Sequence, residues 1–193
     1  VVNITPAGAE PHDYELTAKE IAQITRSDLL IINGGSFEPW GNRITRELAN
    51  SQTTVVVAGS AFINRDIEEG GERIQDPHVW LNPLLAKEIS GRILQGFVSA
   101  DPSRAALYQA NFALLEQQLD ALDAEYAQKL TACERRDIVT PHAAFGYLAE
   151  RYRLRQSTIA GITPDAEPSV QKLTQITEFV RREGITHIFF ESL

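Results

Sequence analysis

The chain has 193 residues, 43% of them hydrophobic, and a formal net charge of −8 from 18 basic and 26 acidic side chains. This composition predicts one or two folded domains and excludes an intrinsically disordered chain. The acidic balance argues against a nucleic-acid partner, because phosphate binding needs clustered Lys and Arg side chains.

The sequence contains no run of 18 apolar residues that could form a membrane-spanning helix. No signal peptide is visible, and the chain starts without Met inside an expected strand. The chain ends just at the exit of another expected strand, so we expect that both ends have been cut.

In the first hundred residues, apolar runs alternate with amphipathic stretches. Residues 29–32 and 55–57 are continuous apolar runs, which are typical of strands buried on both faces of a parallel sheet. Thr17 and Glu20 have the spacing of a capping box, and Asn82 before Pro83 is typical of a helix start. The predicted elements, in chain order, are a strand over 1–5, a helix after Thr17, a strand over 28–33, a helix over 39–50, a strand over 53–58, a polar surface loop over 59–75 and a helix from Pro83 to about Ser99.

The longest predicted element is a helix from Pro102 to about Cys133. Its apolar residues recur at steps of three or four, which places them on one stripe of a helix. The 32 residues would span roughly 48 Å at about 1.5 Å per residue, and a helix of this length would limit hinge motion between two lobes. The stripe consists of Tyr108, Phe112, Leu115, Leu119, Leu122, Tyr126 and Leu130.

The last sixty residues again alternate strands and helices. The predicted elements are a strand over 137–140, a helix over 143–152, a strand over 154–159, a loop over 161–168, a helix capped by Ser169 that ends at Gly184, and a strand over 185–190. The whole order predicts an α/β chain with parallel sheets in two halves. Binding sites in such folds lie at the carboxyl ends of strands, where His12 and His142 are expected, whereas His78 begins a loop-to-helix turn.

Three histidines occur in similar local settings, each directly after a proline and shortly before an aromatic residue. They are His12, His78 and His142, followed by Tyr14, Trp80 and Phe145. The ligands of a local zinc finger are closely spaced, so these histidines can form one site only if distant loops converge. Neutral imidazoles are the commonest protein ligands of first-row transition metals, and the sequence therefore predicts a metal-binding protein, with zinc favoured.

Two further residues are expected to lie outside such a site. The single cysteine, Cys133, cannot form an internal disulfide, and a buried or half-buried structural cysteine is favoured over a metal ligand. His187 lies inside the last predicted strand, where a packed or surface side chain is favoured.

Four motifs occur in an order that resembles one known family. They are Pro11–Glu15, Asp76–Pro83, His142–Leu148 and Ala166–Ser169. These motifs closely resemble those of the zinc- and manganese-uptake solute-binding proteins of bacterial ABC transporters, the cluster A-I metal-binding lipoproteins. The resemblance covers essentially the whole chain.

The resemblance implies two α/β lobes with parallel sheets, joined by one long helix as in class III periplasmic binding proteins, with one metal ion in the cleft. It predicts an N-terminal lobe over residues 1–100 whose first strand and helix are missing, a linking helix over 101–133 and an incomplete C-terminal lobe over 134–193. It also implies a monomer, not an enzyme, that captures a divalent metal outside the cytoplasmic membrane. Such a protein is periplasmic, secreted or a cell-surface lipoprotein, and it delivers the ion to an ABC-type permease.

Carried over residue by residue, His12 and His78 match the two ligands of the first lobe, and His142 matches the first ligand of the second. In manganese-preferring members this third position is often Glu. Histidine at position 142 therefore favours Zn²⁺ over Mn²⁺, because a nitrogen-rich ligand set suits zinc better.

Three carboxylates are also candidates for the site. The family's fourth ligand is an Asp or Glu that would fall beyond Leu193, and Glu191 is a possible substitute ligand. Glu15 and Asp76 lie close to ligands in the sequence and could accept a hydrogen bond from an imidazole, or simply cap loops. Some zinc members have a loop rich in His and acidic residues at 59–75, where this chain has acidic residues but no histidine.

Three alternative functions remain open at this point. The first is a manganese-specific binding protein of the same type. The second is a zinc-dependent hydrolase, which needs an open coordination position and a general base, although the sequence has no His-Glu-x-x-His motif. The third is a surface adhesin, because adhesion needs only an exposed patch on the same fold.

Overall fold

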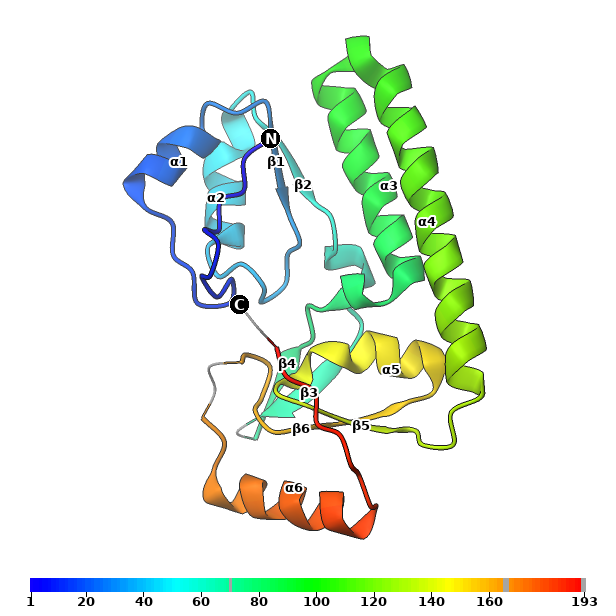
Figure 1. Ribbon diagram of the computed structural model, residues 1–193. Coiled ribbons are helices and arrows are strands. Elements are labelled where there is room, and N and C mark those ends of the chain that lie inside the picture. The colour runs from blue at the N-terminus through cyan, green and yellow to red at the C-terminus, as the bar shows by residue number, and fades with distance from the viewer. Residues whose placement is uncertain (70, 165–166, 192–193) are drawn as a thin grey trace.

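The computed structural model describes residues 1–69, 71–164 and 167–191 (Figure 1). Within them, one parallel sheet pairs β1 (Leu29–Ile32) with β2 (Thr54–Val57), and a second pairs β5 (Asp137–Thr140) with β6 (Arg155–Thr158). An antiparallel hairpin, β3 (Asp66–Glu69) and β4 (Glu72–Gln75), lies between them in the sequence. The prediction of an α/β chain with parallel sheets in two parts is confirmed.

Three helices begin directly after the capping residues that the sequence predicts. Thr17 caps α1 (Ala18–Ile24) in a complete capping box with Glu20, and Asn82 caps α3 (Pro83–Ala100), which has proline at its first position. Ser169 caps α6 (Val170–Arg182). The other helices are α2 (Gly41–Glu47), α4 (Ala105–Thr131) and α5 (Gly146–Tyr152), with short 3₁₀ turns η1 (Leu48–Asn50), η2 (Ser60–Phe62), η3 (Val79–Leu81), η4 (Pro102–Arg104) and η5 (Ala143–Phe145).

The β1–β2 sheet is covered on both faces, as its continuous apolar strands require. On one face, Leu30 and Ile32 pack with buried side chains of α1, α2 and the residues around them. On the other, Ile31 and Val56 pack with Ile89 of α3. The first core consists of Ile24, Leu30, Ile32, Trp40, Ile44 and Leu48, and the second of Ala58, Val79, Ile89 and Tyr147.

The long helix α4 packs antiparallel against α3, and it also contacts α5 (Figure 1). Its predicted stripe is only half-buried, and Leu115 and Leu122 are each 40% exposed. Near its C-terminal half, the Asp123 carboxylate accepts hydrogen bonds from Arg151 and Tyr152 of α5. α4 therefore contacts both α3 and α5. The predicted domain boundaries at residues 100 and 133 stay predictions. None of the helices in the described residues is long and apolar enough to cross a membrane.

The two predicted terminal strands are wrong. Residues 1–5 form no strand, although Ile4 packs against the first core, so His12 follows a series of turns and not a strand. Residues 185–190 form no strand either, although the Phe189 N–H donates to the Val139 carbonyl of β5 at 3.0 Å. A short apolar run does not specify a strand by itself, and most apolar side chains of these two segments are exposed, among them Val2, Phe189 and Phe190.

Two other predictions need correction. The polar segment 59–75 is not a plain surface loop, because it contains the 3₁₀ turn η2 and the β3–β4 hairpin, in which Ile67 and Ile74 face each other. Cys133 is exposed and not buried, because it lies beyond the end of α4, where the chain leaves the half-buried stripe. In the fourth family motif, Ala166 lies outside the described residues.

Candidate metal centre

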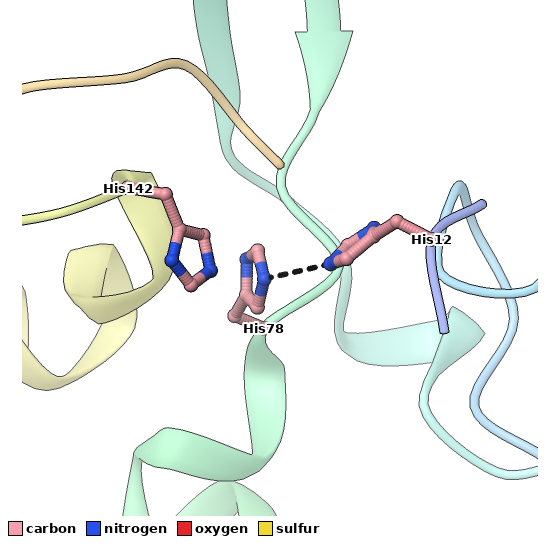
Figure 2. Close-up of side chains that lie close together, drawn as sticks. All are labelled: His12, His78 and His142. Carbon is pink, nitrogen blue, oxygen red and sulfur yellow. Dashed lines mark hydrogen bonds between the residues drawn. The ribbon is translucent and has the colours of Figure 1, made fainter. Parts of the chain in front are cut away.

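The three histidines singled out by the sequence come together in the structure. Each of His12, His78 and His142 offers a ring nitrogen that lies within 4.8 Å of those of the others. Figure 2 shows that the three imidazoles come from three separate segments and point toward one another. Their relative exposures are only 7%, 2% and 6%. This is the convergence of distant loops that a single site requires.

Each histidine is held by its own segment. The backbone N–H of His12 donates to the Glu10 carboxylate at 3.1 Å, within a turn before α1. His78 lies directly before η3. His142 follows the carboxyl end of β5, and its carbonyl accepts hydrogen bonds from Thr140 at 2.8 Å and Gln156 at 3.1 Å. His142 thus lies at the sheet edge where α/β folds place ligands.

A buried carboxylate orients His78. Asp76 is 0% exposed, and its Oδ1 atom accepts hydrogen bonds from the His78 Nδ1 at 2.8 Å and from the His78 backbone N–H at 3.0 Å. This contact fixes the proton of neutral His78 on Nδ1 and leaves the lone pair on Nε2. The free lone pair faces the other two rings.

The other two imidazoles also have an acceptor on the side away from the cluster. The Nδ1 atom of His142 lies 2.9 Å from Glu191 Oε2, although the approach is not aligned as a hydrogen bond. The Nε2 atoms of His12 and His78 lie 3.2 Å apart, which leaves the Nδ1 side of His12 for its hydrogen bond to the Ser36 backbone. With acceptors outside, the lone pairs of neutral imidazoles are turned inward, where they can bind a cation.

Burial favours the neutral form of His12 and of His142. Desolvation, followed by repulsion from His78 and His142, lowers the pKa of His12 to about 4. Desolvation also lowers the pKa of His142, and the Glu191 carboxylate opposes this effect. Metal ligation requires unprotonated imidazoles, so these pKa shifts favour the ligating form at neutral pH.

A cavity of about 260 Å³ opens onto the three histidines. Aromatic rings form one side of it: Phe37 lies 5.0 Å from the His12 ring and 4.7 Å from Trp80, which in turn lies 5.4 Å from His78. Phe145, Glu10 and Glu191 also line the cavity. The site is therefore partly enclosed by apolar rings and has two carboxylates at its border.

The remaining predicted residues fall in different places. The prediction that Glu15 orients an imidazole is wrong in this structure, because its side chain is 69% exposed and its carboxylate faces Arg43 at 3.9 Å. His187 is exposed and contacts Thr186, apart from the cluster. Trp80 and Phe145, the aromatic residues that follow His78 and His142 in the sequence, line the site, whereas the Tyr147 hydroxyl donates to the Asp76 carbonyl.

Sequence reasoning missed several residues around the site. Ser36 contributes a backbone group, which leaves no trace in the side-chain pattern. Phe37 and Arg65 are far in sequence from the histidines they support, and no motif connects them. Glu10 directly precedes the Pro11–His12 pair, and this closeness in the sequence is the signal that could have indicated its contact with His12.

The fold and the cluster together define an α/β metal-binding protein of the solute-binding type. The family described as "ZnuA: Zinc-uptake complex component A periplasmic" matches residues 1–193, and the chain belongs to this family. It is 33% identical over 211 residues to the zinc-binding protein AdcA of Streptococcus pyogenes serotype M1. That alignment covers 99% of this chain but 41% of the relative, so the chain spans about two fifths of its length.

Solved structures of relatives have the same fold. The laminin-binding adhesin Lmb from Streptococcus agalactiae, in a mutant form, aligns with a TM-score of 0.88 at 30% identity, covering 97% of this chain and 70% of that one. The Zn(II)-bound ZnuA-like domain of Streptococcus pneumoniae AdcA aligns with a TM-score of 0.81 at 34% identity, covering 98% and 69%. The expected fold of metal-uptake solute-binding proteins is confirmed.

Proposed function

We propose that this chain binds one Zn²⁺ ion through the Nε2 atoms of His12, His78 and His142, as cargo for uptake. The observation that carries the proposal is the set of three buried ring nitrogens within 4.8 Å of one another. The names of the family and of a zinc-bound relative support zinc as the ion. Three nitrogen donors suit zinc better than manganese, which prefers oxygen ligands.

In this proposal, Asp76 and Glu191 do not bind the ion and instead orient two of its histidine ligands. Each carboxylate lies against the Nδ1 atom of a histidine, the position from which outer carboxylates fix the tautomer and orientation of a zinc ligand. Glu191 therefore supports His142 and does not serve as the substitute ligand, because its carboxylate is directed at His142. A carboxylate or water from outside the cluster would complete four-coordinate zinc.

The biological role follows from the family. We infer that the protein works as a monomer outside the cytoplasmic membrane and passes the ion to an ABC-type permease, as a component of a zinc-uptake complex. Transport requires release as well as capture, and the partly open cavity beside the histidines supports an exchangeable ion. Family membership favours this role over a zinc-dependent hydrolase.

A second function is favoured by one observation. A structural relative bears the name laminin-binding adhesin, so adhesion is an added role that the same fold can carry. The test is binding of this chain to immobilised laminin, with and without zinc. Saturable binding would support the added role, and no binding above that of an unrelated acidic protein would reject it.

The test of zinc binding is competitive titration of zinc and manganese by calorimetry. The wild-type chain is expected to bind one zinc ion, more tightly than manganese. His78→Ala should abolish tight binding, whereas His187→Ala, which removes an exposed histidine outside the cluster, should not alter it. Equal affinity of the wild type and His78→Ala would reject the three-histidine site.

A further inference from the structure

The hairpin and α5 meet at a partly buried contact directly behind the histidines. The Nε atom of Arg65, at the foot of β3, lies 3.7 Å from Asp76 Oδ2, and its Nη1 atom lies 2.6 Å from the carboxylate of Glu150 on α5. The guanidinium also lies over the ring of Tyr147, 5.6 Å from its centroid. One arginine therefore contacts the carboxylate behind His78 and two side chains of α5.

Tyr147 joins the two ends of the hairpin to α5. Its hydroxyl accepts hydrogen bonds from the backbone N–H groups of Asn64 at 3.0 Å and Arg65 at 3.3 Å, and it donates to the Asp76 carbonyl at 3.2 Å. Tyr147 is 3% exposed and packs with Val79, next to His78, in the second core. In Figure 1 the hairpin accordingly extends away from the β1–β2 sheet and lies beside α5.

Gly146, the first residue of α5, rests directly on this ion pair. A Cβ atom at position 146 would lie 2.7 Å from Asp76 Oδ2 and 2.8 Å from Arg65 Nε, distances that real Cβ atoms essentially never show. A side chain at this position would require Asp76, Arg65 or α5 to move. The missing side chain therefore permits the close approach of the two segments.

The same contact connects the segments that carry His78 and His142. Asp76 holds Nδ1 of His78 with one oxygen and meets Gly146 with the other side of its carboxylate, and Gly146 follows His142 by four residues. The rings of His78 and His142 are 5.3 Å apart. Zinc requires each nitrogen at about 2 Å, so small changes in this separation should be felt by the ion.

We propose that Arg65 and Gly146 are positioning residues of the metal site, which set the separation of His78 and His142 without touching the ion. The proposal rests on the proposed zinc binding. Arg65 supplies the positive charge nearest to the buried Asp76 carboxylate and ties it to α5, and Gly146 lets α5 approach. Changes at residues that support metal ligands typically lower affinity by about 10- to 100-fold.

The first test is Gly146→Ala, with Gly91→Ala as the matched control. Both glycines lie in helices, where Ala is the better helix former, but a Cβ at position 91 meets only Phe112 at an ordinary 3.7 Å. We expect zinc affinity to fall about 10- to 100-fold in Gly146→Ala and to stay unchanged in Gly91→Ala. The loss for manganese should be smaller, because a larger ion demands less of the nitrogen geometry.

The second test is Arg65→Met with Arg65→Lys beside it, in case Gly146→Ala fails to fold. Arg65→Met should weaken zinc binding to a similar extent, and Arg65→Lys, which keeps the charge, should restore part of it. Arg43→Met, which removes a half-exposed arginine paired with Glu15, is the control. Visible absorption of bound Co²⁺ is recorded for each folded variant, since its intensity reports the coordination geometry directly.

The outcomes separate this proposal from the one on which it rests. If the wild type binds no zinc, both are overturned. If the wild type binds zinc and His78→Ala does not, but Gly146→Ala and Arg65→Met match the wild type in affinity and Co²⁺ spectrum, only the positioning role is overturned. Weaker zinc binding with an altered Co²⁺ spectrum in folded variants, and normal controls, supports it.

Discussion

The Nε2 atoms of His12 and His78 lie 3.2 Å apart, while the opposite side of each ring meets an acceptor. When both imidazoles are neutral with protons on Nδ1, two lone pairs face each other in a buried place. Such a pair is unfavourable until a positive charge lies between the nitrogens. A cation between these nitrogens would relieve the repulsion, and the expected responses to metal, pH and substitution follow from this arrangement.

Zinc should stabilise the folded chain. A ligand that binds only the native state adds about 2.7 kcal/mol to the free energy of unfolding when its free concentration is 100 times Kd. Urea unfolding with and without zinc measures this gain, and excess chelator should remove it. His78→Ala should show no gain. Equal stabilisation of the wild type and this variant would place the bound zinc elsewhere.

The metal-free protein should lose stability in mild acid. The pKa of His12 is lowered from 6.5 to about 4 by burial and by the other two histidines, and that of His142 is lowered by burial. Between these pH values the unfolded chain binds protons that the native chain does not, so the free energy of unfolding decreases as the pH falls from about 6.5 toward 4. For His12 the decrease is about 3 kcal/mol, at roughly 1.4 kcal/mol per pKa unit.

Urea denaturation in the presence of chelator, at a series of pH values from 7.5 to 4.5, measures this dependence. His12→Asn removes one of the two histidines with a lowered pKa and should flatten the slope. A slope that is identical in the variant and the wild type would contradict the assignment to His12.

Asp76→Asn should weaken zinc binding by about 10- to 100-fold. The amide keeps the size of the carboxylate but loses the charge that orients His78 and attracts Arg65. Asp66→Asn, at an exposed position of the same hairpin, is the control and should bind zinc like the wild type. Calorimetric titration at constant pH measures both variants, and an unchanged affinity of Asp76→Asn would show that this carboxylate has no part in ligand orientation.

Glu191→Gln distinguishes a carboxylate behind His142 from a carboxylate on the metal. If Glu191 only orients His142, the amide oxygen of Gln can still face Nδ1, and zinc affinity should fall by about 10-fold or less. Loss of a direct ligand would lower affinity much further and change the absorption spectrum of bound Co²⁺. The Co²⁺ spectrum of the variant therefore decides between the two roles.

Much of this arrangement could be predicted from the sequence, because it depends on local chemistry. The capping residues Thr17, Asn82 and Ser169 begin the helices that they predict. The apolar runs of β1 and β2 form a parallel pair, and the repeated proline–histidine setting marks the three side chains that converge. Each of these signals lies within a few residues of the structure it specifies.

The missed features have a different physical origin. The Ser36 backbone group has no sequence signature, and the contact of Arg65 with Asp76 and Gly146 exists only after α5 has docked. The β3–β4 hairpin did have a signal, since two glycines separate the segments that carry Ile67 and Ile74, but the surrounding charges suggested a loop.

Trp80, one of the aromatic residues beside the histidines, provides an intrinsic fluorescence probe of the site. The chain has two tryptophans: Trp80 lies 5.4 Å from His78, whereas Trp40 is 4% exposed within the first core. An ion entering the site changes the electric field at Trp80 and leaves Trp40 as a constant background. Intrinsic fluorescence can therefore follow loading and release in real time, without a dye and without altering the site.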